Sequence, residues 1–247
     1  MSLRSFSANR LRLAARASTI WNRSNYKDTW NRLARNYESA KRNVGGSVDE
    51  AELDRTGLYT ADLLDRFVRI GPADVVLEIG CGVARVGKLL APRCRTWIGA
   101  DVSRHMLAHA RRRLGTLPNV QLVELTGHGL DGLEDDSIDV VYCTVVFMHL
   151  LEWDRYRYIL DAFRVLRPGG RCFFDNADIT STHGWDLFMQ SFRVAPGERA
   201  PNLSMVSSGD ELLTYASRAG FGHVQVHRWD DAWVGVVGTK PEPPRAT

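Results

Sequence analysis

The sequence predicts an α/β fold with a mostly parallel sheet, because short apolar runs alternate with helix-like segments along most of its 247 residues. Five strands are expected in this part of the chain, at 75–80, 96–100, 120–125, 138–145 and 171–176. The helices expected between them lie at 84–91, 103–114 and 153–166. Residues 139–146 form a near-continuous apolar run, which is typical of a central strand covered on both sides. The pattern therefore predicts βαβ units with helices on both faces of the sheet.

Two further helices are expected before the first strand. An amphipathic stripe at three- and four-residue spacing predicts one helix that ends at Gly45-Gly46; its members are Tyr26, Trp30, Leu33, Tyr37 and Ala40. A second helix is expected from about Asp49 to Val68, before the turn at Gly71-Pro72.

The C-terminal part follows a different pattern. Residues 207–211 resemble a helix start and Gly220 a helix stop. Two strand-like runs, 223–229 and 232–238, are separated only by Asp230-Asp231. This spacing predicts a terminal antiparallel pair of strands.

Composition and charge restrict the class of protein. Apolar residues make up 44% of the chain and charged residues 25%, which is ordinary for a globular protein. There is no run of about 18 apolar residues, so no integral membrane association is expected. The four cysteines, at 81, 94, 143 and 172, lack C-x-x-C spacing. We therefore expect neither a zinc site nor disulfides, and a cytoplasmic location.

The net charge of +3 is unevenly distributed. Residues 1–48 hold ten Lys or Arg and two Asp or Glu, a net of +8, and the remainder holds 22 and 27, a net of −5. The first 27 residues contain no acid, and such a basic start also resembles a transit peptide or a contact for an anionic partner. A solvated basic end is the simpler interpretation. Because no basic-aromatic module follows, nucleic acid is not expected as a partner.

A glycine-rich loop follows the strand expected at 75–80. The strand reaches Glu78, the chain then turns through Gly80 and Gly82, and a helix follows. Glycine permits a sharp turn and a close approach of the backbone to a ligand. Asp101 ends the next strand, 19 positions after Gly82, an interval that suits an acid binding the ribose of a nucleoside cofactor.

The loop favours a sulfonium nucleoside over a dinucleotide. A dinucleotide site requires G-x-G-x-x-G, but Arg85 stands where the third glycine is needed. Glu78 would repel a pyrophosphate, whereas it could hold a cationic ligand. S-adenosylmethionine carries a sulfonium, an ammonium and no phosphate, so it is the expected cofactor.

Three segments resemble the class I methyltransferases that use S-adenosylmethionine. Residues 78–82 (Glu-Ile-Gly-Cys-Gly) are similar to their first motif, and 101–107 to their D-x-S-x-x-M-L segment. Residues 166–171 are similar to the turn before their fifth strand. The resemblance covers about residues 70–240. It implies a Rossmann-like, seven-stranded, mostly parallel sheet with a reversed terminal strand, and it leaves about the first 45 residues unexplained. With the residue patterns, the expected organisation is a basic helical extension at 1–48, a methyltransferase domain at 49–240 and a tail at 241–247.

The resemblance also implies the residues that bind the cofactor. Asp101 would take the ribose, Val102 would pack on adenine, and Ser103 would cap the following helix. The full expected set is Glu78, Gly80, Cys81, Gly82, Asp101, Val102, Met106, Gly127, His128 and Thr144. Many relatives have an acid after the third strand that binds the adenine amino group. Here His128 stands at that position, so it is a binding candidate only.

His149 and Asp175 are the candidate catalytic residues. They follow the fourth and fifth strands, whose carboxyl ends lie where ligands bind in an open parallel sheet. His149 could take a hydroxyl proton during methyl transfer to oxygen, or it could simply satisfy local backbone groups. Asp175 could orient His149 or bind a substrate hydroxyl, or form a turn. Asp175 and Asp178 lie close together, but two acids make a weak case for a metal, so none is expected.

Residues 177–206 form a connection longer than usual between the fifth strand and the next helix. Its apolar residues have helical spacing, which predicts a packed helix, a substrate lid, or both: Trp185, Phe188, Met189 and Phe192. Tyr26, Tyr37 and Tyr59 could line the opposite side. Aromatic planes with polar groups favour a hydroxylated small molecule, with a saccharide or glycosylated metabolite as the leading acceptor.

The function predicted from sequence is therefore O-methylation of a small-molecule hydroxyl. Two alternatives remain open. One is N- or C-methylation of a small metabolite, and the other is a non-catalytic cofactor-binding protein that acts through its basic N-terminus. The oligomeric state is not predicted by the sequence.

Overall fold

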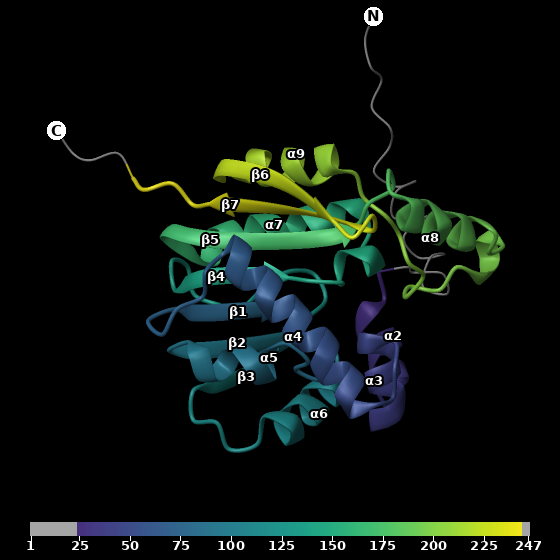
Figure 1. Ribbon diagram of the computed structural model, residues 1–247, viewed down its shortest axis with the longest axis horizontal. Helices are drawn as coiled ribbons and strands as arrows, with labels where there is room; N and C mark the ends of the chain where they lie inside the picture. Colours follow the sequence, from purple (N-terminus) through teal and green to yellow (C-terminus); the bar gives the residue numbers. More distant parts are fainter. Residues whose placement is uncertain (1–23, 244–247) are drawn as a thin grey trace, which may run out of the picture.

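The computed structural model describes residues 24–243, which form a seven-stranded sheet in the order β3-β2-β1-β4-β5-β7-β6 (Figure 1). The strands are β1 (Val75–Ile79), β2 (Thr96–Asp101), β3 (Val120–Glu124), β4 (Ile138–Cys143), β5 (Leu166–Ala177), β6 (Gly222–Trp229) and β7 (Trp233–Thr239). Strands β1 to β5 pair in parallel. Strand β7 runs antiparallel to both β5 and β6. The predicted parallel sheet with a reversed last strand is confirmed.

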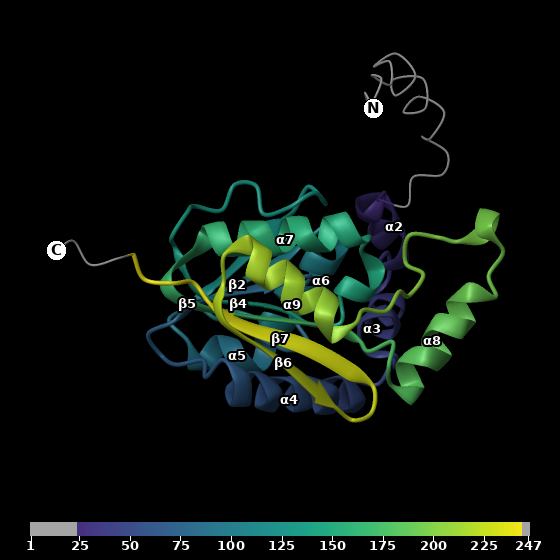
Figure 2. The same ribbon diagram turned by 90° about the horizontal axis from the view of Figure 1, so that it is seen from above.

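Eight α-helices surround the sheet in the described part of the chain. They are α2 (Tyr26–Leu33), α3 (Tyr37–Gly45), α4 (Glu50–Phe67), α5 (Gly87–Leu90), α6 (Arg104–Leu114), α7 (Glu152–Val165), α8 (Thr182–Phe192) and α9 (Gly209–Ala219). Figure 2 shows α4 and α5 on one side of the sheet and α7 and α9 on the other. The basic stretch 1–23 and the last four residues, parts of the expected extension and tail, lie outside the described residues.

Alternation along the strands produces two apolar cores. In β1, Leu77 and Ile79 pack in the core that also contains Ile159 of α7 and Leu212 of α9. Val76 of the same strand packs in the core that contains residues of α4, α5 and α6. Since successive strand residues point to opposite faces, burial on both sides explains why the central strands read as continuous apolar runs.

The expected single N-terminal helix is two helices. Helix α2 ends at Leu33, and α3 begins at Tyr37 after Asn36, whose side chain accepts the backbone N–H of Ser39 at 2.8 Å. The hydroxyl of Ser39 donates to the carbonyl of Leu33 at 2.6 Å, which satisfies the end of α2. The prediction of a continuous helix was wrong because a capping asparagine breaks the helix inside an uninterrupted apolar stripe.

Helix α6 holds the N-terminal helices in place. His105 Nδ1 lies 2.8 Å from the carbonyl oxygen of Asn31, and His109 Nε2 lies 3.0 Å from that of Ala34. Both nitrogens donate, because a carbonyl oxygen only accepts. In Figure 1, α2 and α3 lie at the end of the sheet where the strand arrows of β1 and β4 terminate. The extension therefore covers the carboxyl ends of the parallel strands.

The helix after the glycine loop is shorter than expected. The sequence predicted a helix over 84–91, whereas α5 covers only Gly87–Leu90 and continues as a 3₁₀ turn over Ala91–Arg93. Ala84 has a φ of +59°, in the left-handed region, so it cannot belong to a right-handed helix. The loop therefore extends further into the chain than its two glycines indicate.

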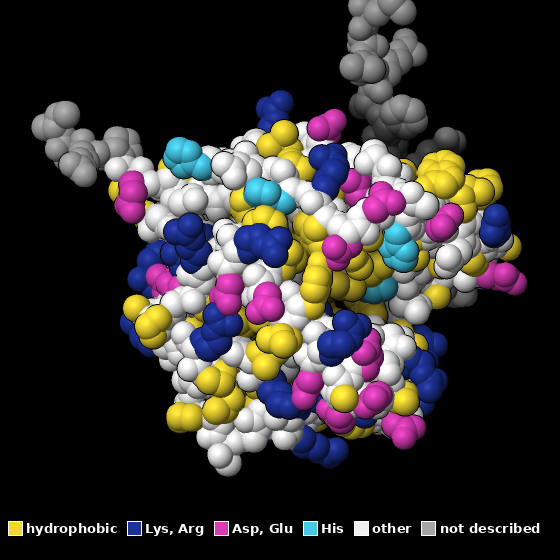
Figure 3. All heavy atoms as spheres, in the orientation of Figure 1, with side chains coloured by type: hydrophobic (Ala, Val, Ile, Leu, Met, Phe, Trp, Pro, Cys, Tyr) yellow, Lys and Arg dark blue, Asp and Glu magenta, His cyan; other side chains and the backbone are white. Residues whose placement is uncertain are grey.

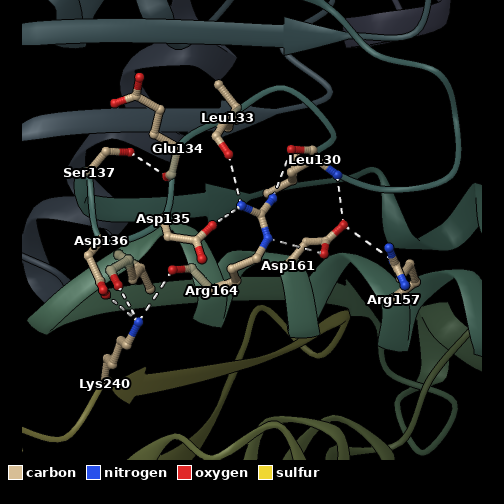
Figure 4. A network of polar contacts seen from close by, with 11 residues as sticks. Leu130, Leu133, Glu134, Asp135, Asp136, Ser137, Arg157, Asp161, Arg164 and Lys240 are labelled. Atoms are coloured by element: carbon tan, nitrogen blue, oxygen red, sulfur yellow. Dashed lines mark hydrogen bonds and ion pairs between the residues drawn. The ribbon is translucent and has the colours of Figure 1, made fainter.

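The connection between β3 and β4 is fixed to α7 by polar contacts (Figure 4). Arg164 donates to the carbonyl oxygens of Leu133 at 2.8 Å and Leu130 at 3.0 Å. The carboxylate of Asp161 accepts the backbone N–H of Leu130 at 2.9 Å. These contacts give the long connection one position, next to the carboxyl end of β3.

Candidate active site

A cavity opens at the carboxyl ends of β1, β2 and β4, beneath α2 and α3. It encloses about 830 Å³ when its open mouth is included. The strands and their following loops supply Glu78 to Gly82, Arg85, Asp101, Val102, Met106, Leu125, Thr144 to Val146, His149 and Leu150, and the helices supply Tyr26, Trp30, Asn43, Val44 and Tyr158. Ligands of open parallel sheets bind at this edge.

Asp101 organises the glycine loop. Its carboxylate accepts the backbone N–H of Gly82 at 2.9 Å and that of Ser103 at 2.8 Å. Gly80 and Gly82 have φ values of +73° and +53°, and a Cβ on Gly80 would lie 2.4 Å from a methyl carbon of Val146. Burial raises the pKa of Asp101 to about 6, although the backbone N–H bonds act in the opposite direction. A carboxylate accepts about four hydrogen bonds, so it retains capacity for a ribose hydroxyl.

Glu78 lies deeper, in a buried hydrogen-bonded chain. Tyr142 donates its hydroxyl to Glu78 at 2.5 Å, and the indole N–H of Trp97 donates to the Tyr142 oxygen at 3.2 Å. Burial raises the pKa of Glu78 to about 8. A cation bound beside this carboxyl would restore its charged form.

Arg85 brings a positive charge to the same cavity. Its Nη1 donates to the carbonyl oxygen of Thr56 at 2.6 Å and to the hydroxyl of Thr60 at 2.9 Å, both on α4. Burial lowers its pKa, and the charges of Glu78 and Asp175 act in the opposite direction. The sequence pointed to Arg85 only as the residue in place of a third glycine.

His149 forms part of the wall near the end of β4. Its ring is half-buried and lies edge-on to Trp30, with the ring centroids 5.0 Å apart. Burial lowers its pKa to about 4, opposed by a hydrogen bond to the backbone of Asn202. Nδ1 is buried and has no hydrogen-bond partner among the described residues. The imidazole is therefore neutral near pH 7, with one nitrogen available as an acceptor.

Asp175 does not line the cavity. It is buried at the end of β5, where its carboxylate accepts the backbone N–H of Val145 at 2.7 Å, and burial raises its pKa to about 7. Val145 has a φ of +59°, so this bond holds a left-handed residue in the loop that leads to His149. Its expected catalytic role stays a prediction. Asp178 is instead paired with Arg228 at 2.7 Å.

The structure brings most of the expected site residues together. Those that line the cavity are Glu78, Gly80, Cys81, Gly82, Asp101, Val102, Met106, Thr144 and His149. Gly127 and His128 lie outside its wall, and His128 is exposed. The sequence did not point to Trp30, Asn43 and Val44 as site residues, because they reach the wall only through the packing of α2 and α3 on the sheet. It also did not point to Val146, in the loop after β4.

The long connection after β5 contains α8, which Figure 1 shows projecting beside α2 and α3. Trp185, Phe188 and Phe192 stack along it with centroid distances of 5.3 and 6.3 Å, and Trp185 is 52% and Phe192 61% exposed. Figure 3 shows apolar atoms gathered over this helix. The returning chain reaches the site, because Met205 donates its N–H to the carbonyl of Met148 at 2.6 Å. The predicted helix is confirmed, and its role as a lid stays a prediction.

Residues 24–243 contain no group of three or more His, Cys, Asp or Glu side chains placed to hold a metal ion. Within the same range, every helix is too short or too polar to cross a bilayer. All four cysteines are buried free thiols.

Comparison with known proteins shows which proteins this chain resembles. Residues 77–174 match the family described as "Methyltransferase domain". A protein of Mycolicibacterium smegmatis, named a probable S-adenosylmethionine-dependent methyltransferase, is 39% identical over 38% of this chain and 35% of its own length. A ubiquinone biosynthesis O-methyltransferase of Pseudomonas fluorescens is 32% identical over 40% of this chain and 42% of its own. A human thiol S-methyltransferase is 30% identical over 47% of each chain. The matches thus span less than half of each of these relatives.

Solved structures support the fold. The YcgJ protein of Bacillus subtilis superposes with a TM-score of 0.61 at 17% identity, over 75% of this chain and all of that one. A phosphoethanolamine N-methyltransferase of Haemonchus contortus, in complex with phosphoethanolamine and S-adenosylhomocysteine, has a TM-score of 0.61 at 16% identity, over 91% of this chain and 50% of its own.

The matched segment is similar to class I S-adenosylmethionine-dependent methyltransferase domains, and the sheet order agrees with the fold of the solved neighbours. S-adenosylmethionine is the cofactor that these matches indicate, and the lining of the cavity carries groups suited to its parts. Asp101 can take ribose hydroxyls, Glu78 can face the ammonium group, and the apolar side chains of Val102, Met106 and Leu125 can receive the adenine.

Proposed function

We propose that this chain methylates a hydroxyl group of a small molecule, with His149 as the group that takes the proton. The observation that carries the proposal is the neutral imidazole in the cavity wall, whose Nδ1 has no hydrogen-bond partner among the described residues.

The contacts of His149 suit a general base. Burial lowers the pKa of the imidazole, the backbone of Asn202 acts in the opposite direction, and Nδ1 has no hydrogen-bond partner among the described residues. When bound, S-adenosylmethionine would supply the methyl group to the acceptor oxygen and leave as S-adenosylhomocysteine with the electron pair of the broken S–C bond. His149 holds the acceptor hydroxyl by its proton and takes that proton as the new bond forms. The walls then keep the acceptor in line.

Nδ1 is closed to solvent in this conformation. The acceptor must therefore enter with a local opening of the wall. The segment near Asn202 is the part expected to move, because it contacts His149 directly and belongs to the long connection after β5.

The walls beside His149 are mainly apolar. Trp30 lies edge-on to the imidazole, and Tyr26, Val146 and Leu150 complete this part of the lining. The Tyr26 hydroxyl donates to the carboxylate of Asp154 at 2.6 Å and accepts the backbone N–H of Leu151 at 3.1 Å. These walls favour a hydroxyl carried by an apolar or aromatic frame over one in a bare saccharide. The saccharide expected from the sequence stays a prediction for the same assay.

Other acceptors are represented among the relatives, which include O- and S-methyltransferases. N- or C-methylation remains the alternative, since the lining also carries the acids Glu78 and Asp101 and the aromatic Trp30, which suit an amine acceptor. A purely cofactor-binding protein would not need the free acceptor nitrogen of His149. We place the enzyme in the cytoplasm, a compartment that keeps buried thiols such as Cys143 reduced.

The test uses His149→Ala, with His128→Ala as a matched control on an exposed histidine outside the cavity. Labelled S-adenosylmethionine is incubated with phenolic, aliphatic and saccharide hydroxyl compounds, and transfer of the label is measured. We expect the wild-type chain and His128→Ala to label a hydroxyl compound. Turnover by His149→Ala should fall by about 10²–10⁴-fold, a typical contribution of general acid–base catalysis, with cofactor affinity within about threefold. Equal turnover in both variants would remove His149 as the base.

A further inference from the structure

We propose that Arg85 binds the carboxylate of the methionine part of S-adenosylmethionine. The inference rests on the cofactor of the proposed function, and it is independent of which acceptor is methylated. It concerns a residue that stands where a dinucleotide site would have its third glycine.

The position of Arg85 is fixed from two sides. Its side chain is only 7% exposed and lines the cavity, and Nη1 is anchored by the carbonyl of Thr56 and the hydroxyl of Thr60. Helix α4 packs directly on its backbone at Gly57, where a Cβ would lie 2.6 Å from the carbonyl oxygen of Arg85. The guanidinium is therefore held in one place before any ligand arrives.

The other guanidinium nitrogens remain available. Nε and Nη2 of Arg85 make no hydrogen bond to residues 24–243. Neither nitrogen is among the fully buried side-chain atoms of that range that lack a hydrogen-bond partner. No direct bond joins Arg85 to Glu78 or Asp175 within those residues, although both carboxyls interact with it at longer range. An arginine that served only as a counter-ion would form such a bond. This guanidinium instead keeps two donors for a planar, bidentate partner such as a carboxylate.

The charges of the cavity match the ligand. Arg85 is the only Lys or Arg among the lining residues, beside the two acids Glu78 and Asp101. The cofactor carries two positive groups, the sulfonium and the ammonium, and one carboxylate. Glu78 and Asp101 would repel that carboxylate. Arg85 is the one positively charged side chain of the lining that can offset the free-energy cost of removing the carboxylate from water.

The experiment compares two ligands in each variant by calorimetry. One is S-adenosylmethionine, and the other is its decarboxylated analogue, which keeps the adenosine, the sulfonium and the amine. The wild-type chain should bind S-adenosylmethionine about tenfold or more tightly than the analogue, as expected for charge-assisted bonds. In Arg85→Gln the affinity for S-adenosylmethionine should fall by about 10–100-fold and that for the analogue by less than about threefold. The preference between the two ligands would then disappear.

Two variants control this result. Arg85→Lys keeps the charge without the planar fork, so it should retain part of the preference even if Arg85→Gln folds poorly. Arg55→Gln changes an exposed arginine of α4 that pairs with Glu52, and it should leave both affinities unchanged. An equal loss for both ligands in the Arg85 variants, or an unchanged preference, would contradict the proposal. Failure of the wild-type chain to bind either ligand would instead overturn the cofactor assignment.

Discussion

Glu78 and Asp101 show how burial prepares this site for a cationic cofactor. Both carboxyls lie below the surface of the cavity, and burial raises their pKa values to about 8 and about 6. At pH 7 the free protein therefore holds a proton on Glu78, whose charged form a bound cation would favour. The cost of burying these acids is reduced once the ligand is in place.

Cofactor binding should consequently release protons and tighten as the pH rises. The complex holds Glu78 charged beside the ammonium, whereas the free protein keeps it protonated up to about pH 8. Affinity therefore increases with pH between about 6 and 8, by at most about tenfold per unit for one proton. Calorimetry at pH 7 in buffers of different ionisation enthalpy should detect the released proton. Glu78→Gln should remove it, and an affinity independent of pH over this range would contradict the assignment.

Residue roles were predictable where the signal is local. The spacing of Gly80, Gly82 and Asp101 lies within one βαβ unit, so the sequence alone indicated the cofactor loop. Arg85 and Trp30 could not be assigned in that way, because their partners, Thr56 on α4 and His149 after β4, lie far along the chain.

At the level of elements, the N-terminal cap depends on a helix break that the apolar stripe concealed. Asn36 starts α3, and α3 carries Asn43 and Val44 to the wall of the cavity. The spacing of apolar residues indicates which face of a helix is buried. It does not reveal a short turn after which the apolar residues continue at the same spacing. The capping side chain was the only local sign of the break.

Substitution of Asn36 tests how much this N-capping side chain contributes to stability. Asn36→Ala loses the bond to the N–H of Ser39 and should lower the free energy of unfolding by about 1 kcal/mol. Thermal unfolding should shift down by about 2–4 °C in a protein of this size. Arg35→Ala, an exposed neighbour in the same turn, is the control and should change stability by less than about 0.5 kcal/mol. Equal melting temperatures for the two variants would show that the cap does not hold α3.

The long connection after β5 also shows what the spacing of apolar residues cannot predict. The spacing of its aromatic residues predicted α8, and α8 is present. Periodicity alone could not tell that Trp185 and Phe192 would be exposed rather than packed. Which surface a helix contacts depends on the rest of the molecule, and α8 projects from the edge of the sheet instead of covering it.

For the whole molecule, the parallel sheet and its reversed last strand followed from the sequence. Each strand was a separate apolar run, and the short Asp230-Asp231 turn required antiparallel neighbours. The cavity is a property of the assembled sheet, since its walls come from the ends of three strands and from the cap. This is why the donor site was predictable in outline while Gly127 and His128 fell outside the wall.

The most direct test of the account is a calorimetric titration of S-adenosylmethionine into the wild-type chain and into Asp101→Ala. Asp101 is central because it both shapes the glycine loop, through Gly82 and Ser103, and offers its carboxylate to the ribose. We expect one cofactor per wild-type chain and a loss of affinity of about tenfold or more in the variant, from the missing charge-assisted bonds. The same affinity in both proteins would contradict the cofactor site described here.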